Sequence, residues 1–263
     1  SMVNDRVYQD LIGGGYRMLF VGDHGQLPPV GGDPRIMEKP DTLLRVIHRQ
    51  DDQGLLDFAH GLRTNTPVSR LEARGAVEKI LLDPQDAVPG FSDALHGSDV
   101  TLCWRNSTRH YLNHLLLQLR GKLPDSLRFD PKSAVEVLRV LARTHDPVRF
   151  VCLRNNYRSK LFNGEQVEGR ITDFRRETVW ITLEDGREIT SPIDGFRGDP
   201  RGTEFPPTMV LLDFGDCLTA HKAQGSEWPW VCVYDDYGRR EDRDRWTYTA
   251  ATRAQQRLTW CHR

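Results

Sequence analysis

Apolar residues occur along this chain in short continuous runs, and these runs alternate with segments in which apolar residues recur at helical spacing. Residues 100–104 form one such run, and the leucines between residues 112 and 119 recur at intervals of three and four. The run predicts a buried strand and the spacing an amphipathic helix. By the same criteria we predict strands at 16–21, 208–213, 231–234 and 258–261, and helices at 2–11, 55–62 and 246–254. Recurring strand, polar loop and helix predict an α/β fold with a mainly parallel sheet.

Two regions depart from this alternation. Residues 64–89 are polar and interrupted by proline and glycine, so we expect only a short helix there, near residues 76–82. Residues 150–207 instead hold stretches in which β-branched and aromatic residues alternate with polar ones, at 167–174, 178–183 and 187–193. Asp185-Gly186 lies between the last two stretches and is a strong hairpin signal. We therefore predict a small β-barrel in this region.

Composition indicates a globular chain without a strong charge bias. Hydrophobic residues make up 38% of the 263 residues and charged residues 28%, while 36 Lys and Arg balance 37 Asp and Glu. This balance excludes a strongly basic nucleic-acid binder, although a local basic groove remains compatible with it. The five cysteines are scattered, three of them in apolar runs, and no signal peptide or membrane-spanning run is visible. We expect buried free thiols, a cytoplasmic protein and no membrane partner.

Candidate chemistry is concentrated in residues 218–227, which read L-T-A-H-K-A-Q-G-S-E between two apolar runs. Thr219, His221 and Lys222 could contact a phosphodiester backbone. Gly225 would let the main chain turn or approach a ligand closely. Glu227 could accept a hydrogen bond or orient a neighbouring cation. The alternative is a solvated connection between a strand and a helix.

A second candidate lies where the strand at 100–104 leads into its helix. Ser107 or Thr108 would cap that helix, leaving free N–H groups that favour an anion. Asn106, Thr108 and Arg109 are therefore candidate contacts for a nucleic-acid backbone. Simple helix capping explains the same residues equally well.

Residues 218–227 resemble motif V of superfamily-1 helicases. Three further segments resemble motifs of that family in the family's order: V-G-D-H-G-Q-L-P-P-V at 21–30 (motif III), H-R-Q at 48–50 (motif IV) and Y-T-A-A-T-R-A at 248–254 (motif VI). The Q-L-P-P-V form is similar to the RecD/Dda-like branch, whose members generally move 5′ to 3′ on single-stranded DNA. The resemblance implies a RecA-like, P-loop NTPase-like motor domain with an inserted SH3-like β-barrel.

The resemblance also implies residue roles. Gln26, Arg49 and Arg253 are the implied catalytic residues: Gln26 senses the γ-phosphate, Arg49 contacts it, and Arg253 is an arginine finger. The implied nucleotide-binding set is Asp23, Gln26, Arg49, Gly225, Glu227 and Arg253. The implied DNA-binding set is Asn106, Thr108, Arg109, Asn155, Asn156, Asn163, Thr219, His221 and Lys222. The alternative for Asn155, Asn156 and Asn163 is a plain role in turns.

No G-x-x-x-x-G-K-[ST] phosphate loop and no D-E magnesium motif ahead of residue 16 occurs in the sequence. We therefore interpret residues 1–35 as the end of a first motor domain, 36–149 and 208–263 as the second, and 150–207 as the inserted barrel. ATP and Mg²⁺ are expected in the complete motor and not in this chain alone. Expected partners are single-stranded DNA, the missing N-terminal motor half and other replication or repair proteins. The hypotheses are an ATP-driven DNA helicase or translocase and a non-catalytic DNA-binding or scaffolding module.

Overall fold

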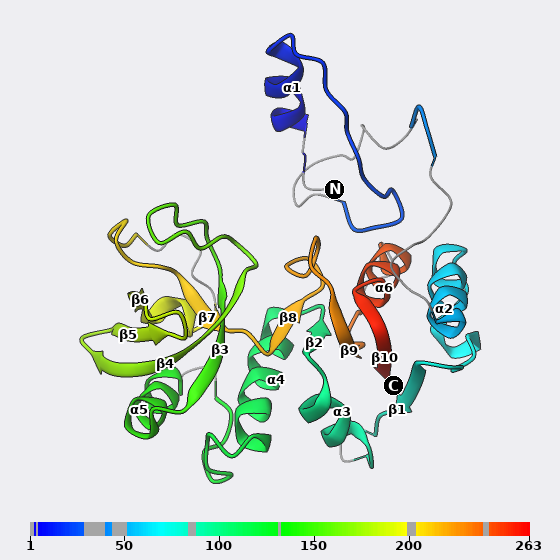
Figure 1. The fold of residues 1–263 in the computed structure, drawn as a ribbon. Helices are drawn as coiled ribbons and strands as arrows, with labels where there is room; N and C mark the ends of the chain where they lie inside the picture. Colours follow the sequence, from blue (N-terminus) through cyan, green and yellow to red (C-terminus); the bar gives the residue numbers. More distant parts are fainter. Residues whose placement is uncertain are drawn as a thin grey trace.

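A computed structural model describes residues 3, 5–28, 40–43, 52–83, 88–130, 133–198, 204–238 and 242–263. It contains two sheets side by side, with helix α4 at their junction and the N-terminal segment above the parallel sheet (Figure 1). The predicted motif IV residue Arg49 lies outside the described residues. No described helix is both long and apolar enough to cross a bilayer.

The first sheet is parallel and confirms the predicted α/β architecture. Its strand order is β1-β10-β9-β2-β8, and all its pairs are parallel. The strands are β1 (Val77–Leu81), β2 (Val100–Cys103), β8 (Cys217–Thr219), β9 (Trp228–Tyr234) and β10 (Ala254–His262). The three central strands, β10, β9 and β2, are rich in buried apolar residues, as expected of strands with covered faces.

Helices α2 (Gln53–Arg63), α3 (Phe91–Gly97), α4 (Asn106–Leu119) and α6 (Arg243–Ala251) accompany this sheet. Helix α2 begins where the Asp52 carboxylate accepts a hydrogen bond from the Leu55 N–H at 3.0 Å. Its buried face includes Phe58, whose ring centroid lies 5.8 Å from that of Trp260 in β10. The predicted amphipathic helix is therefore confirmed, with its apolar face on the sheet.

The second sheet is antiparallel, in the order β6-β5-β4-β3-β7. It contains β3 (Pro147–Cys152), β4 (Gln166–Arg175), β5 (Thr178–Leu183), β6 (Glu188–Pro192) and β7 (Leu212–Phe214). Helix α5 (Ala134–Thr144) shares its apolar core, and two short 3-10 turns complete the regular structure, η2 (Val68–Arg70) and η3 (Ile193–Gly195). The predicted hairpin at Asp185-Gly186 is confirmed: Gly186 has φ +84°, and the Leu183 N–H donates to the Arg187 carbonyl at 2.9 Å.

Two sequence predictions are wrong for the same reason. Residues 76–82 contain strand β1 rather than a short helix, because they pair with β10 along the sheet edge. The apolar run at 208–213 leads into β7 of the antiparallel sheet, and the separate strand β8 precedes the loop at 219–225. Gly215 marks the change of sheet, since a Cβ there would lie 2.6 Å from the Phe150 carbonyl carbon. A short apolar run does not reveal which partner it will pair with.

The N-terminal segment holds helix α1 (Asp5–Gly13), which confirms a helix there, followed by an extended stretch. The predicted strand at 16–21 is absent, because none of these residues pairs with a described strand. Tyr16, Leu19 and Val21 are 80%, 88% and 82% exposed. The apolar character that suggested a buried strand is real, but no described part of the chain covers it.

Helix α4 also begins differently from the prediction. Its N-cap is Arg105, which makes no side-chain capping bond, so Ser107 and Thr108 lie inside the first turn and do not cap the helix. The Asp236 carboxylate instead accepts hydrogen bonds from the N–H groups of Trp104 at 2.6 Å and Arg105 at 3.1 Å. A carboxylate from a distant loop thus fixes the chain where it enters the helix.

Candidate functional site

The loop at 23–28 is seated against both the loop that follows β8 and helix α6. Leu27 is 2% exposed and belongs to the core of the parallel sheet. Its N–H donates to the Thr249 hydroxyl at 2.8 Å, and its carbonyl accepts from the Gln224 side-chain amide at 2.8 Å. Segments that resemble motifs III, V and VI therefore meet at one point, although about 200 residues separate the first from the other two.

A polar cluster holds the same loop from its other side. The Tyr248 hydroxyl donates to the Asp23 carboxylate at 2.8 Å and accepts from the Arg63 guanidinium at 3.1 Å. Arg63 also lies 3.5 Å from Asp23, and the Gly25 N–H donates to that carboxylate at 2.9 Å. Burial and the Asp23 charge raise the pKa of the Tyr248 hydroxyl, which keeps it protonated as a donor. Asp23, a predicted nucleotide contact, is thus also a structural anchor of the loop.

Arg253, the predicted arginine finger, is 2% exposed and bonded within the fold. Its guanidinium and Nε donate to the carbonyls of Ser226 and Thr249, both at 3.1 Å. It therefore joins the end of α6 to the loop after β8. Gln26, half-buried in the seated loop, is the other predicted catalytic residue that the structure describes.

The two remaining predicted nucleotide residues lie on the surface. Gly225 adopts φ +90° with open space around its Cβ position, which supports its role in a turn. Glu227 is exposed and accepts a hydrogen bond from the Gln255 side-chain amide at 2.7 Å.

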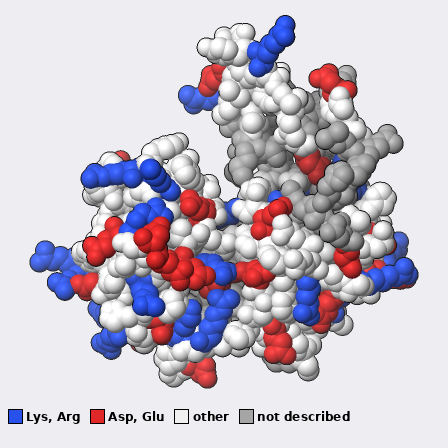
Figure 2. All heavy atoms as spheres, in the orientation of Figure 1, with Lys and Arg blue, Asp and Glu red and all other residues white. Residues whose placement is uncertain are grey.

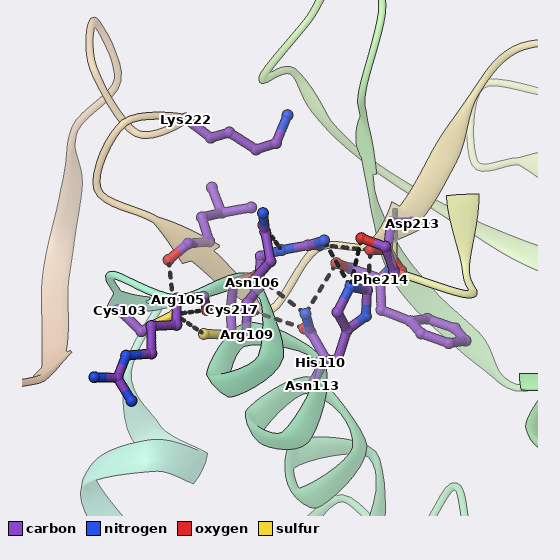
Figure 3. Close-up of polar contacts among 12 residues, drawn as sticks. Cys103, Arg105, Asn106, Arg109, His110, Asn113, Asp213, Phe214, Cys217 and Lys222 are labelled. Carbon is purple, nitrogen blue, oxygen red and sulfur yellow. Dashed lines mark hydrogen bonds and ion pairs between the residues drawn. The ribbon is translucent and has the colours of Figure 1, made fainter. Parts of the chain in front are cut away.

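A second group of predicted residues gathers where the two sheets meet. The Lys222 ammonium lies 3.4 Å from the Asn163 side-chain oxygen, and the Asn163 N–H donates to Asn155 Oδ1 at 2.8 Å. Figure 3 shows the Lys222 side chain extending above the start of α4. Burial lowers the pKa of the Lys222 ammonium, and the nearby Arg109 charge lowers it further. The structure thus brings predicted DNA contacts from both sheets together.

Thr219 and His221, on the same loop as Lys222, are less accessible than a simple surface contact requires. Thr219 is 6% exposed, and its hydroxyl accepts from the Lys222 N–H at 3.4 Å. Burial lowers the pKa of the half-buried His221 ring, which favours its neutral form. Thr219 therefore shapes the turn that presents Lys222.

Asn156 has a structural role. Its side-chain amide donates to the carbonyls of Met209 at 2.8 Å and Pro207 at 3.2 Å, and its oxygen accepts from the Ser159 N–H at 2.9 Å. These bonds support the turn interpretation of this residue.

Arg109 lies in a buried ion pair between the two sheets. Its guanidinium is 2.5 Å from the Asp213 carboxylate, and the two side chains are 2% and 0% exposed. Burial alone would lower the pKa of Arg109, but Asp213 reverses the shift and raises it. Asn106 accepts a hydrogen bond from Arg109 at 3.3 Å and is itself exposed, while Thr108 is half-buried. This arrangement favours a structural role for Arg109 over the predicted DNA contact (Figure 3).

Comparisons with known proteins identify helicases that are similar to this chain. The family described as UvrD-like helicase C-terminal domain matches residues 214–260. The ATP-dependent RecD2 DNA helicase of Deinococcus radiodurans is 27% identical over 282 residues, which cover 98% of this chain and 34% of the relative. The chain is thus similar in sequence to a UvrD-like helicase C-terminal domain and to a RecD2 helicase.

Two solved structures share the fold. A Pif1 helicase from Bacteroides, in complex with ADP-AlF3 and ssDNA, has a TM-score of 0.53 at 15% identity, covering 99% of this chain and 68% of that one. A structure of two coordinating Pif1 helicases on forked dsDNA has a TM-score of 0.54 at 15% identity, with coverage of 99% and 67%. The helicase-like fold therefore extends over nearly all of the chain, while the chain spans about a third of the RecD2 relative.

Motif resemblance did not reveal several residues that hold this site together. Tyr248 opens the segment that resembles motif VI, so its position in that segment was an available signal. Arg63 lies in the last turn of α2, outside any motif. Asn113 was also missed: its amide donates to the carbonyls of Phe214 and Cys217 and accepts from the Cys217 N–H.

Proposed function

We propose that this chain is the C-terminal part of an ATP-dependent helicase that moves 5′ to 3′ on single-stranded DNA. The observation that carries the proposal is the seating of Leu27 between Gln224 and Thr249, which unites the segments resembling motifs III, V and VI. In a motor of this class, closure of the nucleotide cleft has to move the residues that hold DNA. A loop bonded to both candidate regions is suited to transmit such a movement.

We assign DNA backbone binding to the junction of the two sheets. Lys222 supplies a cation, and Asn155, Asn163 and Asn106 supply exposed amide groups nearby. His221 lies on the same loop and would gain a proton if a phosphate were placed beside it. Contacts of this kind position a strand without reading its sequence. We therefore expect binding without base preference.

The residues described here supply only part of a nucleotide site. Gln26 and Arg253 would lie at the phosphate end, but the Arg253 guanidinium is engaged by oxygens of its own fold. Among the described residues, no group of three or more His, Cys, Asp or Glu side chains could hold a metal ion. We assign the binding of ATP and Mg²⁺ to the complete motor.

We further propose that the antiparallel sheet is the SH3-like barrel predicted at 150–207, with β3 and β7 extending it to residues 147–214. It would be inserted between the two parts of the second motor domain, predicted at 36–149 and 208–263, with 1–35 ending the first. Its outer strands approach each other, since the Val210 N–H beside β7 donates to the Thr190 carbonyl of β6 at 2.8 Å. The Leu212 N–H of β7 likewise donates to the Ser191 hydroxyl of β6 at 3.2 Å. Such contacts would close a strongly twisted sheet.

Two assays on the purified chain test the proposal. The chain should bind a single-stranded oligonucleotide more tightly than a duplex of equal length, and it should hydrolyse no ATP above background. Steady ATP turnover that Arg253→Ala abolishes would contradict the assignment of the nucleotide site to the complete motor. Equal affinity for single-stranded and duplex DNA would contradict the assignment of the DNA site.

A further inference from the structure

Residues 154–164, which lie in the loop that joins β3 to β4, expose two aromatic rings. Tyr157 is 77% exposed and Phe162 is 48% exposed, and their ring centroids lie 6.1 Å apart in an edge-to-face arrangement. Exposed large rings that stand together are unfavourable in water unless a ligand covers them. We call residues 154–164 the aromatic loop.

The aromatic loop is held in one shape by the fold beneath it. The backbones of Asn156 and Leu161 form an antiparallel bridge with hydrogen bonds of 2.7 and 3.1 Å. Leu161 is 0% exposed and anchors the loop in the core of the antiparallel sheet. The Arg187 guanidinium also donates to the Ser159 carbonyl at 2.5 Å. These hydrogen bonds keep Tyr157 and Phe162 exposed, because the rings could not pack onto the core without breaking them.

Cationic residues flank the two rings along the loop. Arg158 and Lys160 are exposed, and neither forms an ion pair with another described residue. Arg154 lies over the Phe205 ring at 5.1 Å. The nearby Glu165 carboxylate is occupied by the Phe162 N–H at 2.8 Å. Figure 2 shows Lys and Arg side chains over the loops at this end of the antiparallel sheet. Rings among unpaired cations suit a ligand that is both aromatic and anionic.

The rings also adjoin the backbone contacts proposed above. Phe162 directly precedes Asn163, whose side chain lies 3.4 Å from the Lys222 ammonium. Gly164 approaches the same loop, since a Cβ there would lie 3.1 Å from the Lys222 carbonyl oxygen. A strand whose phosphates pass Lys222 would place its bases beside the aromatic loop.

We propose that Tyr157 and Phe162 form a stacking platform for unpaired bases of a single nucleic-acid strand. The proposal rests on the proposed function, because it takes the strand to run past Lys222. Every base presents a flat face, so stacking adds affinity without sequence preference. The platform binds bases, whereas Lys222 and its neighbours bind the backbone, and the two contributions can be separated.

The test compares two ligands of about 12 nucleotides, a single-stranded DNA and an abasic strand with the same phosphate backbone. Tyr157→Ala and Phe162→Ala should each weaken binding of the base-containing strand by about fivefold or more, from the usual contribution of one stacked base. Binding of the abasic strand should be unchanged in both variants. Tyr157→Phe and Phe162→Tyr should retain wild-type affinity, because each keeps a ring.

Trp180 provides a matched control, as an aromatic residue of the same sheet that is 37% exposed and lies outside the aromatic loop. Trp180→Ala should leave both affinities unchanged. The inference is overturned if the wild-type chain binds both ligands equally, or if the alanine variants lose the same affinity for both. If DNA binding in those cases still weakens in Lys222→Ala, the platform fails and the proposed function stands. If neither ligand binds, the proposed function and the platform fail together.

Discussion

The two sheets differ in how they hold their candidate functional residues. At the parallel sheet, several residues of the helicase-like motifs are buried: Leu27, Thr219 and Arg253 are 2%, 6% and 2% exposed. In the antiparallel sheet, the aromatic loop exposes Tyr157 to 77%. A buried motif residue also stabilises the fold, so its substitution changes both stability and function. Substitution of an exposed residue on a rigid scaffold changes binding without changing stability.

The junction of the two sheets combines both situations. Arg109 and Asp213 form a buried pair there, and Arg120 and Arg149 approach the Asp216 carboxylate at 2.5 and 3.8 Å. These contacts fix the antiparallel sheet relative to helix α4. The position of Lys222 relative to the aromatic loop therefore depends in part on these polar contacts, which we call the seam, alongside apolar ones such as the packing of Leu117 of α4 in the core of the antiparallel sheet.

The largest expected effect comes from breaking this seam. Asp213→Asn leaves the Arg109 charge buried without its partner, which should lower the free energy of unfolding by about 3–5 kcal/mol. Glu78→Gln is the matched control, because the Glu78–Arg257 pair is about half exposed on each side. That substitution should cost less than about 1 kcal/mol. Urea unfolding of the two variants measures both values, and equal losses would contradict a structural role for the buried pair.

A smaller and local effect is expected where the N-terminal segment is seated. Leu27→Ala leaves a cavity in the core and should weaken the seating of residues 23–28 by about 2–5 kcal/mol. The backbone amide of residue 27, whose N–H donates to the Thr249 hydroxyl, should then exchange its hydrogen faster. The control is Leu19→Ala, at a residue 88% exposed in the same segment, which should leave exchange unchanged. Unchanged exchange in Leu27→Ala would mean that the loop does not depend on this anchor.

The outcomes of sequence analysis follow from the range of the interactions involved. Strands at 166–192 were predictable because their alternation and the Asp185-Gly186 turn are local signals. The Arg109–Asp213 pair joins residues 104 positions apart, and nothing in the sequence connects them. The stretch at 16–21 was predicted as a strand from its composition, but a strand also requires a partner. Motif resemblance found Asp23 and missed Arg63, since only the former lies in a recognisable segment.

Acidification should produce the smallest effect on the free energy of unfolding, through one histidine at the seam and one on the loop after β8. Burial lowers the pKa of His110 at the seam, where Asp213 and Arg109 face it, and of His221 beside the proposed DNA contact. At a pH just below 6.5, the ordinary pKa of histidine, these two side chains then bind more protons in the unfolded chain than in the folded one. The free energy of unfolding should therefore be constant above that pH and decrease as the pH falls below it. His221→Gln should reduce this decrease, and an increase in stability on acidification would contradict the shifts.

The proposed contact between Lys222 and the DNA backbone is tested by the salt dependence of single-stranded DNA affinity, measured for the wild-type chain and for Lys222→Ala. Each phosphate that a cation neutralises releases counterions, so wild-type affinity should fall as salt rises. Removing the Lys222 charge should flatten the slope of log affinity against log salt by roughly 0.7. Affinity that does not depend on salt, or a slope that Lys222→Ala leaves unchanged, would contradict the assignment of this loop to the DNA backbone.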